Sequence, residues 1–162
     1  MKKATYAVGR AVMIFLKNIL ITTDLSEYSL AALEYAFTFG LLFGARLCLL
    51  YVDEQGQHRS DRNAAAALEG FAASRIDSRL NLELVTRSGR PAEEISRYAR
   101  EQGMDLIVMA THGRTGLKQA AMGSVAQKVI RLSAVPVLAV KPHAVRESLL
   151  RFADVENELH LR

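Results

Sequence analysis

The 162-residue sequence predicts a single-domain α/β protein whose parallel sheet is covered by helices on both faces. Short apolar or β-branched runs, typical of strands, alternate along the chain with segments whose apolar residues recur at helical spacing. This alternation gives five strands separated by four helices and implies right-handed crossovers between parallel strands. The length is the usual size of one domain, so a single core is expected.

The first half of the chain contains two predicted strands and two predicted helices. Residues 17–23 are apolar and β-branched and predict the first strand. Ser26 is expected to cap the helix that follows, and Gly44 is expected to end it. Residues 46–52 form a continuous apolar run, as in a parallel strand buried on both faces. Residues 61–78 carry a second helical stripe.

The next strand and helix are predicted from alternation and from turn residues. Leucines alternate with polar residues over 80–84 and predict the third strand. Pro91 suits the first position of a helix, and Glu93 and Glu94 lie where the helix dipole favours acidic residues. Gly103 is expected to end this helix.

The last two strands flank a short helix. Residues 105–109 predict the fourth strand, residues 124–133 the helix and residues 135–140 the fifth strand, which Pro136 places at an edge of the sheet. An apolar edge is normally covered, so this strand predicts a homodimer. The residues expected at that interface are Val135, Val137, Leu138 and Val140.

Two end segments are expected outside the domain, which spans residues 16–142. Residues 1–15 predict a disordered leader, because Arg10 interrupts their apolar stretch and no secretory cleavage site follows. Residues 143–162 predict an amphipathic tail that packs on its own domain or dimer mate, or binds a protein partner. Its apolar stripe consists of Val145, Leu149, Phe152, Val155 and Leu159.

Composition excludes several function classes. The net charge of +4 is interspersed and includes no basic run, so a nucleic-acid-binding stripe is not expected. No apolar run approaches the length of a membrane span. Cys48 is the single cysteine and lies in an apolar run, which excludes an internal disulfide and favours a reducing, cytoplasmic location.

The functional site is expected beyond the carboxyl ends of the strands, where the winding of the sheet reverses. That rule selects the loops at residues 22–26 and 110–116. The fingerprint G-x-G-x-x-G is missing from the first loop, and the phosphate-loop motif G-x-x-x-x-G-K-[ST] is missing from the chain. A hydride-transfer enzyme and a standard nucleotide triphosphatase are therefore not expected.

A different glycine-bearing loop follows the fourth strand. Gly113 and Gly116 free the backbone there, and Gly123 and Ser124 open the next helix, whose N–H groups favour a phosphate. From spacing alone, phosphate binding and an ordinary strand-to-helix loop capped by Ser124 are equally good interpretations.

Catalytic and metal sites are not predicted. His112 lies in the loop without a recognisable second acid–base group beside it. Glu93 and Glu94 are adjacent on a helix and do not face each other. No His, Cys and Asp cluster has metal-ligand spacing, so magnesium would arrive with a nucleotide's phosphates.

Residues 105–141, which include Ala110-Thr-His-Gly-Arg-Thr-Gly116 and Gly123-Ser124, resemble the end of the universal stress protein family. The resemblance continues upstream through residues 19–27, 50–53 and 89–95 and covers residues 16–142. It implies a doubly wound, Rossmann-like sheet of the adenine-nucleotide-hydrolase type with strand order 3-2-1-4-5.

The family's nucleotide-binding branch carries G-x-x-G, nine residues, then G-[ST], and Ala110 replaces the first glycine. The resemblance implies that Asp24 contacts the adenosine, that the backbone of Val52 holds the adenine and that the phosphates lie near Gly123. Thr22 stands where many binders have proline, and Ala126 where some have a hydroxyl residue. The candidate nucleotide-binding residues are Thr22, Thr23, Asp24, Val52, Met109, Ala110, His112, Gly113, Gly123, Ser124, Val125 and Ala126.

These observations predict a dimeric stress-response module that binds ATP or a related adenine nucleotide and is not a dedicated enzyme. Two alternatives remain. One is a ligand-free interaction protein with the same fold, and the other is a slow ATPase. Intact Asp24, Gly113, Gly123 and Ser124 favour binding over the first alternative, and the missing base and phosphate-loop lysine count against the second.

Overall fold

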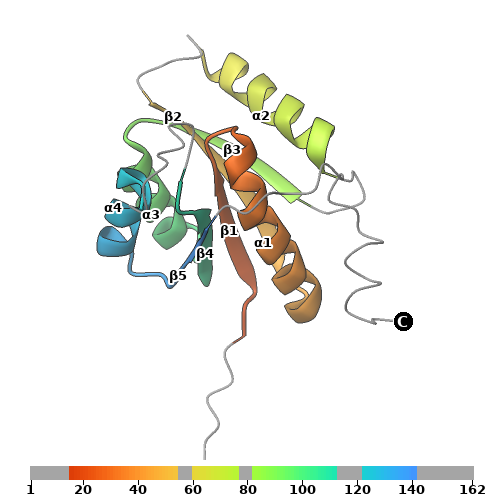
Figure 1. Cartoon of the computed structure of the whole chain (residues 1–162), viewed down its shortest axis with the longest axis vertical. Helices are drawn as coiled ribbons and strands as arrows, with labels where there is room; N and C mark the ends of the chain where they lie inside the picture. Colours follow the sequence, from red (N-terminus) through yellow and green to blue (C-terminus); the bar gives the residue numbers. More distant parts are fainter. Residues whose placement is uncertain (1–14, 55–59, 77–81, 113–121, 142–162) are drawn as a thin grey trace, which may run out of the picture.

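A computed structural model describes residues 15–54, 60–76, 82–112 and 122–141 (Figure 1). Its sheet has five parallel strands in the order β3-β2-β1-β4-β5, which confirms the predicted fold class and strand order. The strands are β1 (Asn18–Thr23), β2 (Arg46–Asp53), β3 (Leu82–Ser88), β4 (Leu106–Ala110) and β5 (Val137–Val140).

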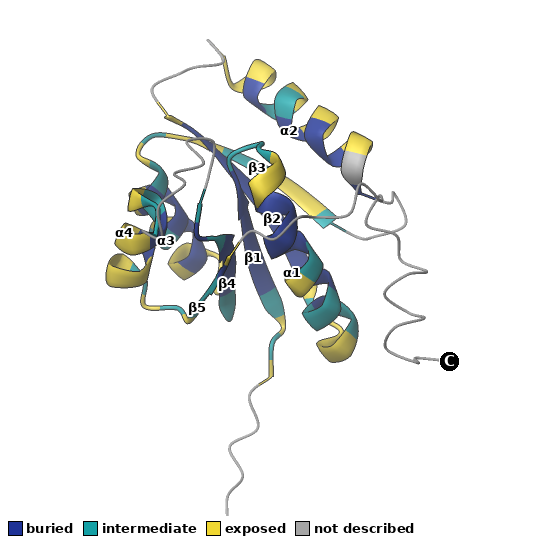
Figure 2. Ribbon diagram, viewed as in Figure 1, coloured by how far each residue is buried: buried dark blue, intermediate teal, exposed yellow. Residues whose placement is uncertain are grey.

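Helices cover both faces of the sheet. They are α1 (Leu30–Phe43), α2 (Asp61–Arg75), α3 (Pro91–Glu101) and α4 (Ser124–Leu132), with a short 3-10 turn, η1 (Glu27–Ser29), before α1. Alternate residues of β1 serve the two layers: Ile19 and Ile21 pack with α1 and α2, and Leu20 packs with α3 and α4. Figure 2 shows β1, β2 and β4 largely buried between the two helical layers, whereas the edge strand β3 is exposed or half-buried. The described residues include no helix long and apolar enough to cross a membrane.

Most predicted element ends are confirmed to within a residue or two, and three are wrong. The third strand, predicted over 80–84, is longer and ends at Ser88. Gly44 ends α1 in the left-handed conformation, with a φ of 63°. Ser26 does not cap α1, because η1 intervenes and the Ser26 hydroxyl donates to Asp24 instead. β5 begins at Val137 rather than at 135, since the Ser133 hydroxyl accepts a hydrogen bond from the Val135 N–H.

At the amino end of the sheet, the carboxylate of Asp105 joins two neighbouring strands. Asp105 Oδ2 accepts hydrogen bonds from the backbone N–H groups of Lys17 and Asn18, both at 2.8 Å. The Asp105 N–H in turn donates to the carbonyl of Asn18. These bonds join the starts of β1 and β4, so this acidic side chain serves the fold.

The single cysteine lies in the layer between the sheet and α3. Cys48 is fully buried, as predicted, and its Sγ lies 3.4 Å from the Tyr98 hydroxyl. The Arg87 guanidinium stacks over the Tyr98 ring, 5.1 Å from its centroid. Burial raises the pKa of the Cys48 thiol, because the thiolate would lose its hydration there.

Candidate functional site

A cleft of about 440 Å³ lies where β1 and β4 end, at the point where the winding reverses. This volume is in the range of small-ligand sites. The predicted residues that line it are Thr22, Thr23, Asp24, Val52, Met109, Ala110, His112, Gly123, Ser124 and Val125. Ala126 does not line it, because its side chain is buried in the core beneath α4. Gly113 lies outside the described residues.

A chain of hydroxyl hydrogen bonds holds the loop after β1. The Leu25 N–H donates to Thr23 Oγ1, which lies 2.8 Å from Ser29 Oγ, and the Ser29 hydroxyl donates to the carbonyl of Ser26. Because each hydroxyl has one proton, Thr23 donates to Ser29. Thr23 and Ser29 are both buried, so this part of the loop is fixed before any ligand arrives.

Asp24 forms the acidic corner of the cleft. Its Oδ1 accepts hydrogen bonds from the Ser26 N–H at 3.1 Å and from the Ser26 hydroxyl at 2.5 Å. Leu25 has a φ of 65°, a left-handed conformation that costs a branched residue about 1–2 kcal/mol. Its side chain packs against the core on the α1 side. The strained turn thus keeps Leu25 in the core while Asp24 lines the cleft.

The loop after β4 meets the start of α4 at Thr111. The Thr111 N–H donates to the carbonyl of Val140, and the Gly123 N–H donates to the carbonyl of Thr111 at 2.7 Å. A Cβ added at Gly123 would lie 3.0 Å from that same carbonyl oxygen. Glycine at 123 therefore allows a close backbone approach that a side chain would crowd, a reason that the sequence motif alone does not reveal.

The N-terminus of α4 and the side chain of His112 share one edge of the cleft. Gly123 is the N-cap of α4 and Ser124 its first residue, and the N-cap supplies no side-chain hydrogen bond to the helix. The first N–H groups of α4 therefore receive no capping bond from Gly123. His112 Nδ1 lies 2.9 Å from the hydroxyl of the buried Thr111, which orients the imidazole ring. The two features form a donor-rich edge suited to an anion.

Part of the cleft wall is apolar. Leu50, Val52, Met109 and Ile95 line it and are themselves buried in the core between the sheet and α3. A flat, largely apolar group would fit against these side chains and still reach Asp24.

Six lining residues were not predicted: Ser29, Leu50, Glu54, Pro91, Ile95 and Thr111. In the sequence, Leu50 and Ile95 resemble ordinary core residues. They also line the cleft because α3 packs beside β2. Thr111 lies in the loop at residues 110–116 and Pro91 in the family-like segment at 89–95, so their places in the sequence could have indicated them. No group of three or more His, Cys, Asp or Glu side chains suited to a metal ion occurs among the residues described.

Ala110, the departure from the family motif, sits at the end of β4 without strain. The described part of the chain contains one non-glycine residue with positive φ, and it is Leu25. Ala110 therefore does not need the conformational freedom of glycine. Its methyl group lines the cleft, so any effect on a ligand is one of shape.

Fold and cleft together define a Rossmann-like α/β protein with a ligand-sized cleft at its topological switch point. Residues 16–141 match the model of the universal stress protein family. The chain belongs to the universal stress protein family.

Individual relatives agree over most of the chain. It is similar to universal stress protein MJ0577 of Methanocaldococcus jannaschii, with 30% identity covering 77% of this chain and 94% of the relative. It is also similar to YxiE of Bacillus subtilis, with 29% identity covering 76% and 98%.

Solved structures agree with these sequence matches. The structure of MJ0577 has a TM-score of 0.68 and 29% identity, covering 82% of this chain and all of that one. The structure of UspA from Lactobacillus plantarum has a TM-score of 0.63 and 25% identity, covering 78% and 98%.

Proposed function

We propose that this protein is a binding module for ATP or a related adenine nucleotide, which acts as a dimeric regulator in a stress response rather than as a dedicated enzyme. The observation that carries the proposal is the cleft. It combines an apolar wall, an ordered carboxylate at Asp24 and the N-terminus of α4 around one ligand-sized volume. These three features match the base, the sugar hydroxyls and the phosphates of a nucleotide.

In this proposal the adenine lies against Val52 and Met109, the Asp24 carboxylate accepts a hydrogen bond from the ribose, and the phosphates face Gly123 and Ser124. The helix dipole and the N–H groups at the start of α4 favour the phosphate charge. His112, oriented by Thr111, adds a donor at the same edge. A magnesium ion would bind with the phosphates rather than in a protein cage.

The fold itself is compatible with such ligands. Solved structures with this fold include a universal stress protein described as a complex with cAMP and one from Archaeoglobus fulgidus described as a complex with dAMP. Their identities to this chain are 24% and 22%, so they support the fold alone. The proposed ligand of this chain is argued from its own cleft.

The second candidate function, a ligand-free interaction protein, is favoured by one observation, the extra methyl group of Ala110 in the cleft. For a slow ATPase the cleft offers His112 as a candidate general base. Its Nδ1 bonds the Thr111 hydroxyl rather than an acidic side chain that would raise its basicity. The cytoplasmic location stays a prediction.

The dimer is proposed to form through β5. This strand pairs with β4 on one side only among the described residues, and Val137 and Leu138 are half-buried at the open edge. Pairing of two such edges about a two-fold axis would satisfy both. Sedimentation at micromolar concentration is expected to give a dimer, and a monomer of 17.9 kDa would contradict the proposal.

Two measurements test the ligand. Mass spectrometry of the small molecule released from natively purified protein is expected to detect an adenine nucleotide. Thermal unfolding with added ATP, AMP or GTP is expected to show a rise in Tm with the adenine nucleotides, because a ligand that binds only the folded state stabilises it. No carried ligand and no shift with any adenine nucleotide would leave the ligand-free alternative.

A further inference from the structure

The outer face of α1 is apolar where a surface helix is normally polar. It consists of Tyr35, Phe39, Leu42 and Phe43, which fall on one stripe at i, i+4, i+7 and i+8. Tyr35, Leu42 and Phe43 are 45%, 51% and 47% exposed, and the rings of Phe39 and Phe43 pack together with centroids 6.4 Å apart. We call these four residues the α1 outer face.

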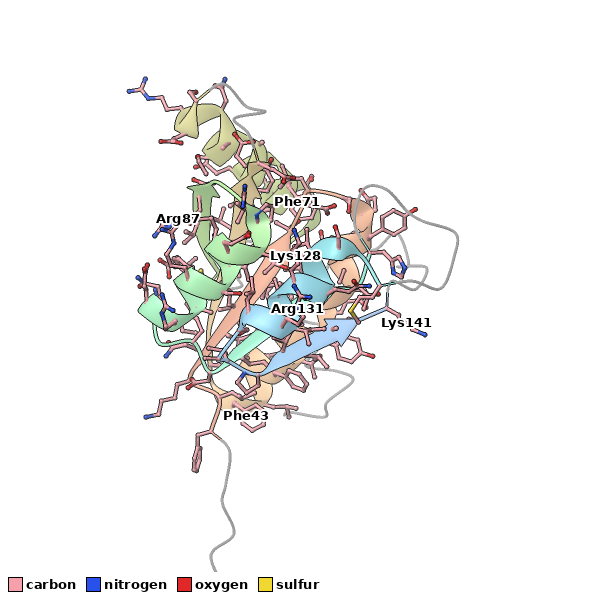
Figure 3. The ribbon with its side chains drawn as sticks, turned by 90° about the vertical axis from the view of Figure 1, so that its left-hand side faces the viewer. Phe43, Phe71, Arg87, Lys128, Arg131 and Lys141 are labelled. Atoms are coloured by element: carbon pink, nitrogen blue, oxygen red, sulfur yellow. The ribbon has the colours of Figure 1, made fainter. Side chains whose placement is uncertain are left out.

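The other described helices differ from α1 in the charge of their exposed faces, although α4 also exposes Ile130 and Leu132. The exposed positions of α3 are charged and include Glu93, Arg97, Arg100 and Glu101. On α4, Lys128 and Arg131 point outward among the exposed side chains, as Figure 3 shows. Exposed apolar patches usually mark a contact surface, so the α1 outer face is expected to have a cover.

The tail of this chain has a matching pattern. Val145, Leu149, Phe152, Val155 and Leu159 follow one another at spacings of four and three, which in a helix places them on one face. A helix over residues 145–159 would be about 22 Å long, and the fourteen residues of α1 span about 21 Å. The tail therefore has the length and the apolar face needed to cover α1.

The tail also starts in the right place. It follows Lys141, the residue after β5, and β5 packs against α1. Because the sheet is parallel and α1 follows β1, the carboxyl end of β5 lies at the same end of the domain as the beginning of α1. Three residues, 142–144, reach about 10 Å when extended, which allows a helix starting at Val145 to run along α1 toward Phe43.

Two other occupants fit less well. The leader before β1 enters near the last turn of α1, where the Arg46 N–H donates to the Lys17 carbonyl, but Gly9 and Arg10 interrupt its apolar residues. A second copy would have to cover a helix that packs on the central strands β1 and β4, whereas the edge strands of the sheet are β3 and β5.

We propose that residues 145–159 form an amphipathic helix that packs its apolar stripe on the α1 outer face of the same chain. The tail then serves as a third helix of the layer formed by α1 and α2. The proposal is independent of the nucleotide, since none of the four outer-face residues lines the cleft.

A tryptophan reporter tests this in the full-length chain, which contains no native tryptophan. Leu42→Trp puts the reporter on the α1 outer face, and Tyr35→Trp repeats the measurement should Leu42→Trp disturb the packing. We expect blue-shifted emission and weak quenching by acrylamide. Adding Phe152→Ser should shift the emission to longer wavelength and increase quenching, whereas Arg151→Ser, off the apolar stripe, should leave both unchanged.

Three results would overturn the proposal. The reporter could be as exposed in the parent as in the Phe152→Ser variant, which would mean that the tail does not cover it. Shielding that appears only as protein concentration rises would assign the cover to a second copy. Shielding that is lost on deleting residues 1–12 but not with Phe152→Ser would assign it to the leader.

Discussion

Asp105 and Asp24 sit at opposite ends of the neighbouring strands β4 and β1, and each accepts two hydrogen bonds on one oxygen. Both bonds to Asp105 come from backbone N–H groups of the segment that enters β1, so this carboxylate joins two strands. Oδ1 of Asp24 accepts hydrogen bonds from the N–H and the hydroxyl of Ser26, two residues away, so these bonds order a local turn rather than join two strands. Asp24 also lines the cleft, and Asp105 does not.

The difference extends to the surroundings of each acid. The carboxyl end of the sheet holds the buried hydroxyls of Thr23, Ser29 and Thr111 and the left-handed Leu25. Burying polar groups and holding a strained residue both cost stability unless the surrounding structure compensates. At one end of the sheet Asp105 joins two strands, whereas at the other end the buried hydroxyls are satisfied by local hydrogen bonds that hold the strained Leu25 turn.

The largest expected effect comes from a charge placed at the start of α4. Gly123→Asp should weaken adenine nucleotide binding by about a hundredfold or more, because like charges at about 4 Å repel by roughly 4 kcal/mol at an effective dielectric constant near 20. Titration calorimetry measures the change in Kd.

Gly123→Ala is the control for shape. Its methyl group would press on the Thr111 carbonyl, so we expect a loss of about 1–3 kcal/mol in the free energy of unfolding. If Gly123→Ala lost binding as completely as Gly123→Asp, backbone displacement rather than charge would explain both results.

Replacing Asp105 or Asp24 by alanine should show that the first acid contributes mainly to stability and the second mainly to nucleotide binding. Asp105→Ala removes the acceptor of two backbone N–H groups and should lower the free energy of unfolding by about 2 kcal/mol, with Kd unchanged. Asp24→Ala should raise Kd by about tenfold, or about 1.4 kcal/mol, with a smaller loss of stability. Urea unfolding and calorimetry on both variants check the pattern, and equal effects on Kd would remove the contrast between the two ends.

The serines at the two ends of α4, Ser124 and Ser133, are expected to differ less in their effect on nucleotide binding. Ser124→Ala removes one hydroxyl from the cleft and should weaken binding by about 1 kcal/mol, since the backbone N–H groups remain. Ser133→Ala removes the hydroxyl that bonds Val135 at the other end of the helix and should leave Kd unchanged. A larger effect on Kd from Ser133→Ala would place the anion elsewhere.

The smallest effect is expected from the leader. Deleting residues 1–12 should leave Tm and nucleotide binding nearly unchanged, because this segment has no predicted place in the sheet. Circular dichroism melts of both proteins make the comparison. A large drop in Tm would show that the leader contributes to the fold.

Much of the fold could be predicted because strand-like apolar runs and helix-like apolar spacing are both local signals in the sequence. Parallel topology then limits the possible strand orders, and the family resemblance selected one of them. Side chains that form local hydrogen bonds in place of the expected cap or strand bond were harder to predict. Ser26 looks like a helix cap in sequence, yet its hydroxyl bonds Asp24, and the start of β5 depends on Ser133 capturing the Val135 N–H.

The cleft was predictable where its residues follow strands β1 and β4, because carboxyl ends of parallel strands meet at one edge. The apolar wall was harder to predict. Leu50 and Ile95 have no motif, and their position in the cleft follows from the packing of α3 against β2. The steric need for glycine at 123 also depends on a contact between distant segments.

The most direct test of the central claim is titration calorimetry of the full-length protein with ATP, AMP and GTP, alongside Ala110→Gly. We expect the adenine nucleotides to bind and GTP to bind more weakly, and Ala110→Gly to match or exceed the parent because it removes one methyl group from the cleft. No heat with any nucleotide in the parent would contradict nucleotide binding by the natural chain. Binding by Ala110→Gly alone would identify that methyl group as the reason.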